Sequence, residues 1–139
     1  MHLTIDYPED DSSWPIIQMD SGKMRDVLLI IIENAVRYNM KDGAIYIKKE
    51  IENGIFTMIV ENTGVGITSE DRGNLFERLF YRSKKAQITH PAGMGIGLSV
   101  SRAIVRAHHG DIVIHSDGEG RGAAVTITLP LDFLKTIYY

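Results

Sequence analysis

The 139-residue sequence contains no cysteine, so it can form neither disulfides nor thiolate metal sites, and it fits a reducing compartment. It has no excess of basic residues either: 15 Lys and Arg oppose 18 Asp and Glu, for a formal net charge of −3. That balance argues against nucleic acid as a partner. The longest apolar run, Val27 to Ile32, is too short to cross a bilayer, and no signal peptide is visible. We therefore expect a cytoplasmic domain that contacts neither nucleic acid nor a membrane.

Two common nucleotide-binding signatures are also missing. No Gly-x4-Gly-Lys-Ser/Thr segment is present, which excludes a P-loop, and strands and helices do not alternate strictly, which disfavours a Rossmann-type parallel sheet. What the chain has is ordinary globular composition, with 44% hydrophobic and 24% charged residues. At this length we expect one domain with a real core over residues 1–139.

A long helix is expected from about Gly22 to Asn39, capped by Asp20 or Ser21. It would place one apolar stripe at steps of three and four, consisting of Met24, Leu28, Ile31, Ala35 and Tyr38. The run from Val27 to Ile32 would also suit a buried strand, but the length of the periodic segment favours a helix.

The other segments indicate hairpins and shorter helices. Asn53-Gly54 between alternating runs is a strong hairpin signal, and Gly110 is expected to stop the last helix. We expect strands over about 3–6, 44–51, 55–61, 111–116 and 123–129, and further helices over about 68–76 and 96–109. The pattern predicts an α+β fold: a two-layer α/β sandwich in which about three helices cover one face of a mixed, mostly antiparallel sheet.

Three glycines on alternate residues, Gly93, Gly95 and Gly97, lie just before and at the start of the last expected helix. Glycine lets the backbone approach a ligand closely, and a helix start just beyond offers free N–H groups that suit phosphate. The segment before them carries four cations that would favour a triphosphate, namely Arg78, Arg82, Lys84 and Lys85. The alternative is a solvated basic loop.

Asn34 lies just beyond the apolar run of the long helix, where an unpaired amide would be costly. Its oxygen could be a ligand for Mg²⁺, which prefers a few protein oxygens together with phosphate. Arg37 and Tyr38 lie three and four residues further on and share its face, and Arg37 could touch phosphate. The alternative is a helix whose polar face simply emerges from the core.

A glycine-bearing loop follows the strand expected to end at residue 61. Asn62 there can hold an amino-purine edge, because its carbonyl accepts and its amide donates hydrogen bonds. Gly64 and Gly66 would let the backbone wrap a flat ring. The alternative is an ordinary strand-to-helix turn. Gly120-Arg121-Gly122, between the last two strands, is expected to make a turn rather than contact a ligand.

In their order, four segments strongly resemble the catalytic ATP-binding domain of sensor histidine kinases, a member of the GHKL ATPase superfamily with the gyrase and heat-shock chaperone ATPases. They are Glu33–Tyr38, Asn62–Ile67, Leu75–Arg82 and Gly93–Leu98. The resemblance covers about residues 20–130 and leaves 131–139 as a C-terminal tail. It implies an α/β sandwich with ATP between the long helix, the glycine loops and a lid over 83–92.

The resemblance also implies site roles by position. Asn34 would coordinate the Mg²⁺ that bridges the phosphates, and Arg37 and Arg82 would contact phosphate, so that these three form the catalytic set. Tyr38 would lie beside the ribose or base. The remaining cofactor-binding positions are Asn62, Gly64, Gly66 and Ile67 near the adenine and Gly93, Met94, Gly95, Ile96, Gly97 and Leu98 at the phosphate end.

Three departures from the family pattern stand out. The usual adenine-binding Asp is Asn62 here, which keeps one acceptor but replaces the second oxygen with a donor. The helix usually carries another Asn four residues before Asn34, and here that residue is Ile30. The aromatic segment has one residue more than expected, so the alignment of Glu77 through Tyr81 is open.

The resemblance implies a protein-histidine kinase domain of a two-component system. With ATP and Mg²⁺, it would donate the γ-phosphate to a histidine on a separate dimerisation domain, upstream of a response regulator, in a parent that the inner membrane could anchor. None of the five histidines lies in a helical hairpin beside an acidic residue, so we expect structural or solvated roles for His2, His90, His108, His109 and His115.

Two other functions stay open. One is a degenerate relative that acts as a protein-interaction module with weak or no ATP binding, as Asn62 and Ile30 would allow. The other is a superfamily ATPase or serine kinase. Glu33 is adjacent to Asn34, but one position turns it by about 100° around a helix, which argues against a water-activating base.

Overall fold

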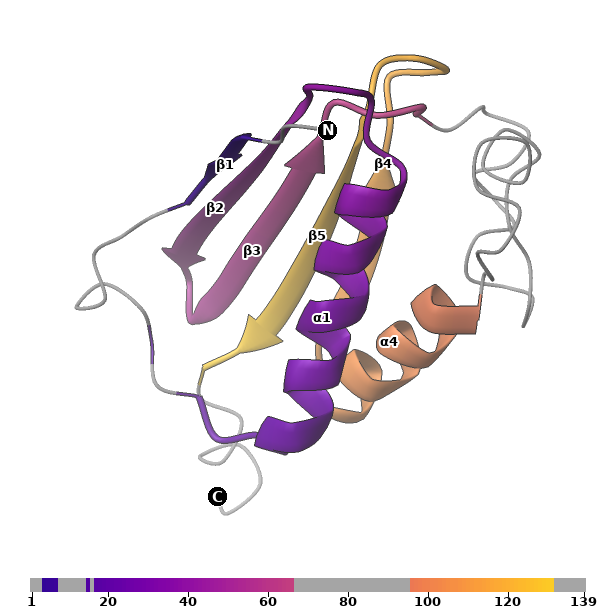
Figure 1. Cartoon of the computed structure of the whole chain (residues 1–139). Coiled ribbons are helices and arrows are strands. Elements are labelled where there is room, and N and C mark those ends of the chain that lie inside the picture. Colours follow the sequence, from indigo (N-terminus) through magenta and orange to yellow (C-terminus); the bar gives the residue numbers. More distant parts are fainter. Residues whose placement is uncertain (1–3, 8–14, 16, 67–95, 132–139) are drawn as a thin grey trace.

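The computed structural model describes residues 4–7, 15, 17–66 and 96–131 (Figure 1). In these ranges the elements are, in chain order, β1 (Thr4–Asp6), α1 (Ser21–Arg37), β2 (Ala44–Glu52), β3 (Ile55–Asn62), α4 (Ile96–Ala107), β4 (Asp111–His115) and β5 (Ala123–Pro130). The strands form one five-stranded sheet in the order β1-β2-β3-β5-β4. β1 pairs with β2 in parallel, and the other neighbours are antiparallel.

Both described helices lie on one face of this sheet (Figure 1). The expected α+β sandwich with a mixed, mostly antiparallel sheet is therefore confirmed. The third expected helix, over 68–76, lies outside the described residues. In the part of the chain that is described, no helix is long and apolar enough to span a membrane.

α1 forms where the sequence predicts it. The Asp20 side chain caps it by accepting a hydrogen bond from the Lys23 N–H at 3.0 Å. Its buried residues are Met24, Val27, Ile31 and Ala35. The helix ends at Arg37, with Tyr38 as its cap, rather than at about Asn39. Asn39 leaves the helix because its side-chain amide donates to the Ala44 oxygen at 2.9 Å.

The sheet contributes the other half of the core. Asn53 and Gly54 have φ angles of 52° and 74°, which make the tight turn predicted between β2 and β3. Alternate strand residues point toward the helices and are buried. They are Ile45 on β2, Phe56, Met58 and Val60 on β3, Ile112 and Ile114 on β4, and Ile127 and Leu129 on β5.

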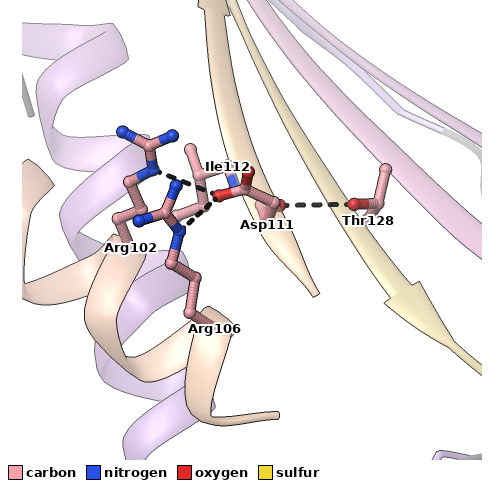
Figure 2. Close-up of polar contacts among 5 residues, drawn as sticks. All are labelled: Arg102, Arg106, Asp111, Ile112 and Thr128. Atoms are coloured by element: carbon pink, nitrogen blue, oxygen red, sulfur yellow. Dashed lines mark hydrogen bonds and ion pairs between the residues drawn. The ribbon is translucent and has the colours of Figure 1, made fainter. Parts of the chain in front are cut away.

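α4 is fastened to the sheet by an acidic residue at the start of β4. Asp111 Oδ1 accepts hydrogen bonds from Arg102 Nε and Arg106 Nε, both at 3.1 Å (Figure 2). The N–H of Ile112 donates to the same oxygen at 2.8 Å. Because the two arginines are one helical turn apart, one carboxylate sets the position of that helix face against β4.

The C-terminal end of α4 also contacts the start of α1. His108 Nε2 accepts a hydrogen bond from the Asp20 N–H at 3.0 Å, and its Nδ1 lies 2.8 Å from the Ile104 oxygen. The ring therefore acts as an acceptor at Nε2 and as a donor at Nδ1. This contact links the end of α4 to the cap of α1, which is the structural role expected for His108.

Candidate nucleotide-binding site

The last turns of α1, the end of β3 and the first turn of α4 meet on the helical side of the sheet. Asn62 Nδ2 donates to the Ala35 oxygen at 3.3 Å, and the Val65 N–H donates to the Tyr38 oxygen at 3.1 Å. At α4, a Cβ on Gly97 would lie 2.9 Å from Ile30 Cγ2. The glycine loop after β3 and the first turn of α4 thus both contact α1 or its cap, where the Glu33–Tyr38 segment lies.

Asn34 is half-buried in the last full turn of α1. Its side-chain amide makes no hydrogen bond to any other residue that the structure describes, and its backbone oxygen accepts from the Tyr38 N–H at 3.0 Å. Arg37 is exposed at the end of the helix. This pair offers one neutral oxygen and one cation, and no described residue forms a hydrogen bond or an ion pair with either side chain.

That donor set fits a metal that is shared with phosphate. Within residues 4–7, 15, 17–66 and 96–131, no group of three or more His, Cys, Asp or Glu side chains could hold a metal ion alone. Mg²⁺ is bound through few protein ligands and substrate phosphates, so a single amide oxygen at Asn34 suits it. The described residues therefore fit Mg²⁺ carried on a nucleotide.

Asn62 is held by hydrogen bonds on both sides of its amide. Its Nδ2 donates to Ala35 in α1, and its Oδ1 accepts from the Ala123 N–H in β5 at 2.9 Å. The side chain thus joins three elements at the point where the glycine loop begins.

The two glycines of this loop are required by close backbone contacts. A Cβ on Gly64 would collide with the Tyr38 oxygen, and a Cβ on Gly66 would collide with the Gly118 oxygen. Gly66 also has a φ of 72°, in the left-handed region. A side chain at either position would push the loop away from α1 or from the β4–β5 turn.

The β4–β5 turn supports the glycine loop from the other side. The Gly120 N–H donates to the Val65 oxygen at 2.7 Å, and the Gly122 N–H donates to the Gly64 oxygen at 3.1 Å. The segment from Gly120 to Gly122 does make the expected turn. The turn also braces the glycine loop, which the sequence did not indicate.

Known proteins resemble this chain in sequence and in fold. A family model described as histidine kinase-, DNA gyrase B- and HSP90-like ATPase matches residues 19–133. The chain belongs to this family. The five-stranded sheet with helices on one face also matches solved histidine kinase domains: for a mycobacterial sensor histidine kinase, MprB, the TM-score is 0.73 at 22% identity, over 92% of this chain and 81% of that chain.

The sequence relatives of this ATPase-family domain include sensor kinases. The sensor histidine kinase WalK of Bacillus subtilis (strain 168) is 35% identical over 116 residues, which are 82% of this chain and 19% of WalK. The sensor protein CutS of Streptomyces coelicolor is 33% identical over 117 residues, which are 84% of this chain and 28% of CutS. The chain therefore spans only a small part of each relative.

One departure from the family pattern has a clear structural counterpart. Ile30, which replaces the usual second Asn, packs against Gly97 at the start of α4. The position therefore contributes an apolar contact between α1 and α4 instead of a polar group.

The structure adds two residues that the sequence did not single out. Asn39 is 6% exposed, and its Oδ1 accepts from the Thr63 hydroxyl at 2.8 Å and from the Met40 N–H at 2.9 Å. Thr63 Oγ1 in turn accepts from the Ala44 N–H at 2.8 Å. This Asn39–Thr63 clamp joins the end of α1 to β2 and to the glycine loop. The available signal was a polar residue at the end of the predicted helix and another two positions after the predicted strand.

The structure describes only some of the remaining predicted site residues. Gly97 and Leu98 are half-buried in the first turn of α4, which begins at Ile96. The others lie outside the described residues: Ile67, Arg82, Gly93, Met94 and Gly95. The expected lid over 83–92 and the basic residues before it also lie outside.

Proposed function

We propose that this chain is the Mg-ATP-binding catalytic domain of a two-component sensor histidine kinase. It would donate the γ-phosphate of ATP to a histidine on the dimerisation domain of the same kinase, and a response regulator would receive the phosphoryl group from there. Family membership and the sensor-kinase relatives support this function. The observation that carries it is the Asn34 amide, which bonds to no side chain or backbone group of the described residues and lies on the helix to whose end the glycine loop is anchored.

The described residues have distinct parts in this function. Asn34 would hold Mg²⁺ through its side-chain oxygen, and Arg37 would contact phosphate. The metal, when bound, neutralises charge on the phosphates. Phosphoryl transfer needs positioning and charge stabilisation more than covalent chemistry on the protein, and such an arrangement can provide both. Arg82, Ile67 and the Gly93–Leu98 segment remain proposed contacts by their place in the motifs.

The test is a thermal-unfolding titration of the full chain with Mg-ATP, with and without EDTA. Ligand that binds only the folded state raises its stability by about 2.7 kcal/mol at a hundred times Kd. Replacing Asn34 with Ala should abolish the part of the shift that requires Mg²⁺. Its neighbour Glu33 is exposed on the same helix, so Glu33→Ala is the matched control and should keep the shift.

Two outcomes would contradict the proposal. An unchanged melting temperature at millimolar Mg-ATP would favour the interaction-module alternative. Rapid ATP turnover that is lost in Glu33→Ala would instead favour a superfamily ATPase with Glu33 as its base.

A further inference from the structure

The orientation of the Asn62 amide is set by two backbone groups of opposite polarity. On the α1 side the Ala35 oxygen needs a donor, and on the β5 side the Ala123 N–H needs an acceptor. A flipped amide would place oxygen against oxygen and N–H₂ against N–H, which would leave both partners unsatisfied. Nitrogen therefore faces α1 and oxygen faces β5.

The Ala35 oxygen has a structural need for this donor. Asn39, four residues on, would donate to it in a continuing helix, but its N–H donates to the Val36 oxygen at 3.3 Å. Asn62 thus satisfies a helix-end carbonyl that the helix leaves unpaired. A carboxylate at this position could not do so, because an ionised carboxylate only accepts hydrogen bonds.

The proposed base subsite adjoins the same side of Asn62. α1 carries Asn34 and Arg37, and the glycine loop begins directly after Asn62. A base edge alongside the last turn of α1 would meet the second N–H of Nδ2, which is a donor. A carboxylate would present an acceptor there. Adenine has an amino group at its 6-position, which donates, whereas guanine and hypoxanthine have a carbonyl oxygen, which accepts.

We propose that Asn62 makes this site accept 6-oxopurine nucleotides at least as well as adenine nucleotides, an inference that rests on the nucleotide-binding function proposed above. The residue is a specificity determinant that reads the 6-position by donating a hydrogen bond. Its fixed orientation prevents it from offering oxygen to the base at that place.

The test measures Kd of the full chain for Mg-ATP, Mg-GTP and Mg-ITP by calorimetry. ITP lacks the 2-amino group of GTP, and its base differs from that of ATP only in the oxygen at the 6-position and the proton that this oxygen places on N1, so it is a close probe of the proposed contact. We expect ITP to bind at least as tightly as ATP. Asn62→Asp should shift the ratio of the two Kd values toward ATP by about tenfold, the size of one exchanged hydrogen bond. Wild-type binding that favours ATP over ITP tenfold, or an unchanged ratio in Asn62→Asp, would overturn the inference.

Asn39→Asp is the matched control, because Asn39 Nδ2 also donates to a backbone oxygen, that of Ala44. Both variants should lower stability, but only Asn62→Asp should change the ATP-to-ITP ratio. If Asn62→Asp does not fold, the wild-type ratio decides, together with Asn62→Ala, which should weaken ITP more than ATP. ATP bound tenfold more tightly than ITP would reject this inference alone. Absence of binding by all three nucleotides would reject the proposed function as well.

Discussion

At the scale of single residues, polar side chains near the site have two different tasks. Asn39, Asn62 and Thr63 each bond to backbone groups of other elements and hold the glycine loop in place. Asn34 makes no such bond to a described residue and stays available for a ligand. Residue type alone does not separate these tasks, because an amide serves equally well as a brace or as a metal ligand.

Asp111 gives a pH-dependent prediction at this scale. Partial burial raises the pKa of its carboxyl. Hydrogen bonds from Arg102, the Ile112 N–H and Arg106 lower this pKa by more than burial raises it, so it lies below the ordinary 3.8. The carboxylate therefore stabilises the fold above the unfolded-state pKa, and this contribution is lost as pH falls through the lower folded-state pKa.

We expect Asp111→Asn to lose about 1 kcal/mol or less at neutral pH, since the side chain is 40% exposed and solvent screens its ion pairs. The difference from wild type should close as pH falls below 3.8. Urea unfolding at several pH values measures both. Asp26→Asn, an exposed carboxylate on α1, should leave stability nearly unchanged at neutral pH. A stability difference between Asp111→Asn and wild type that grows as pH falls would contradict the lowered pKa of Asp111.

At the scale of elements, the position of α4 depends on contacts at both of its ends. Its first turn packs on Ile30 of α1 through Gly97, and its end reaches Asp20 through His108. The arginine pair on Asp111 adds the contact to β4 (Figure 2). These contacts position the first turn of α4, which contains the described residues of the Gly93–Leu98 segment.

A double-mutant cycle tests the contact between the helices. Gly97→Ala places a methyl 2.9 Å from the branched Cγ2 of Ile30, which cannot easily rotate away, so we expect no gain in stability or a loss of about 1 kcal/mol. In an Ile30→Ala background the same change should gain up to about 1 kcal/mol from helix propensity. Urea unfolding measures the coupling.

Gly22→Ala is the matched control for this cycle. Its added Cβ would lie 3.6 Å from Asp20 Oδ1, an ordinary contact in the first turn of α1. Gly22→Ala should change the free energy of unfolding by the same amount in the wild-type and the Ile30→Ala backgrounds. Equal effects of Gly97→Ala in the two backgrounds would mean that Ile30 does not restrict the approach of α4.

At the scale of the whole molecule, the sheet is secured through its centre. β3 pairs along its full length with β2 and with β5, and it carries three core residues. Among the described strands, β1 pairs only with β2, over three positions, and all three of its residues are exposed. Stability should therefore be distributed unevenly across the sheet.

Hydrogen exchange of the full chain measures this distribution. We expect the amides of β3 and β5 to exchange slowest, because their opening requires the central pairing and the core to open together. The amides of β1 should exchange fastest among the strands. Protection of β1 equal to that of β3 would contradict this order.

The sequence predicted those parts of the fold and site that depend on near neighbours. The Asp20 cap and the Asn53-Gly54 turn are local features, and the structure confirms them. Of the predicted α1 stripe, Met24, Ile31 and Ala35 are buried, whereas Leu28 and Tyr38 are half-buried and Val27 is buried in addition. The partners of Asn62 were beyond reach, because Ala35 and Ala123 are 27 and 61 residues away along the chain. Asn39 was read as a helix end for the same reason: its partners in β2 and the glycine loop come together only when the sheet forms.

Local periodicity and ordered motifs in the sequence were sufficient to determine the element types, the fold class and the family, because helix caps, turns and alternating strands act over a few residues. The tertiary structure alone decided which amides bind backbone and which stay available for a ligand, and which helix contact takes the place of a missing polar group. Those choices depend on backbone groups that distant strands and helices bring together, since a hydrogen bond requires its partners within about 3 Å.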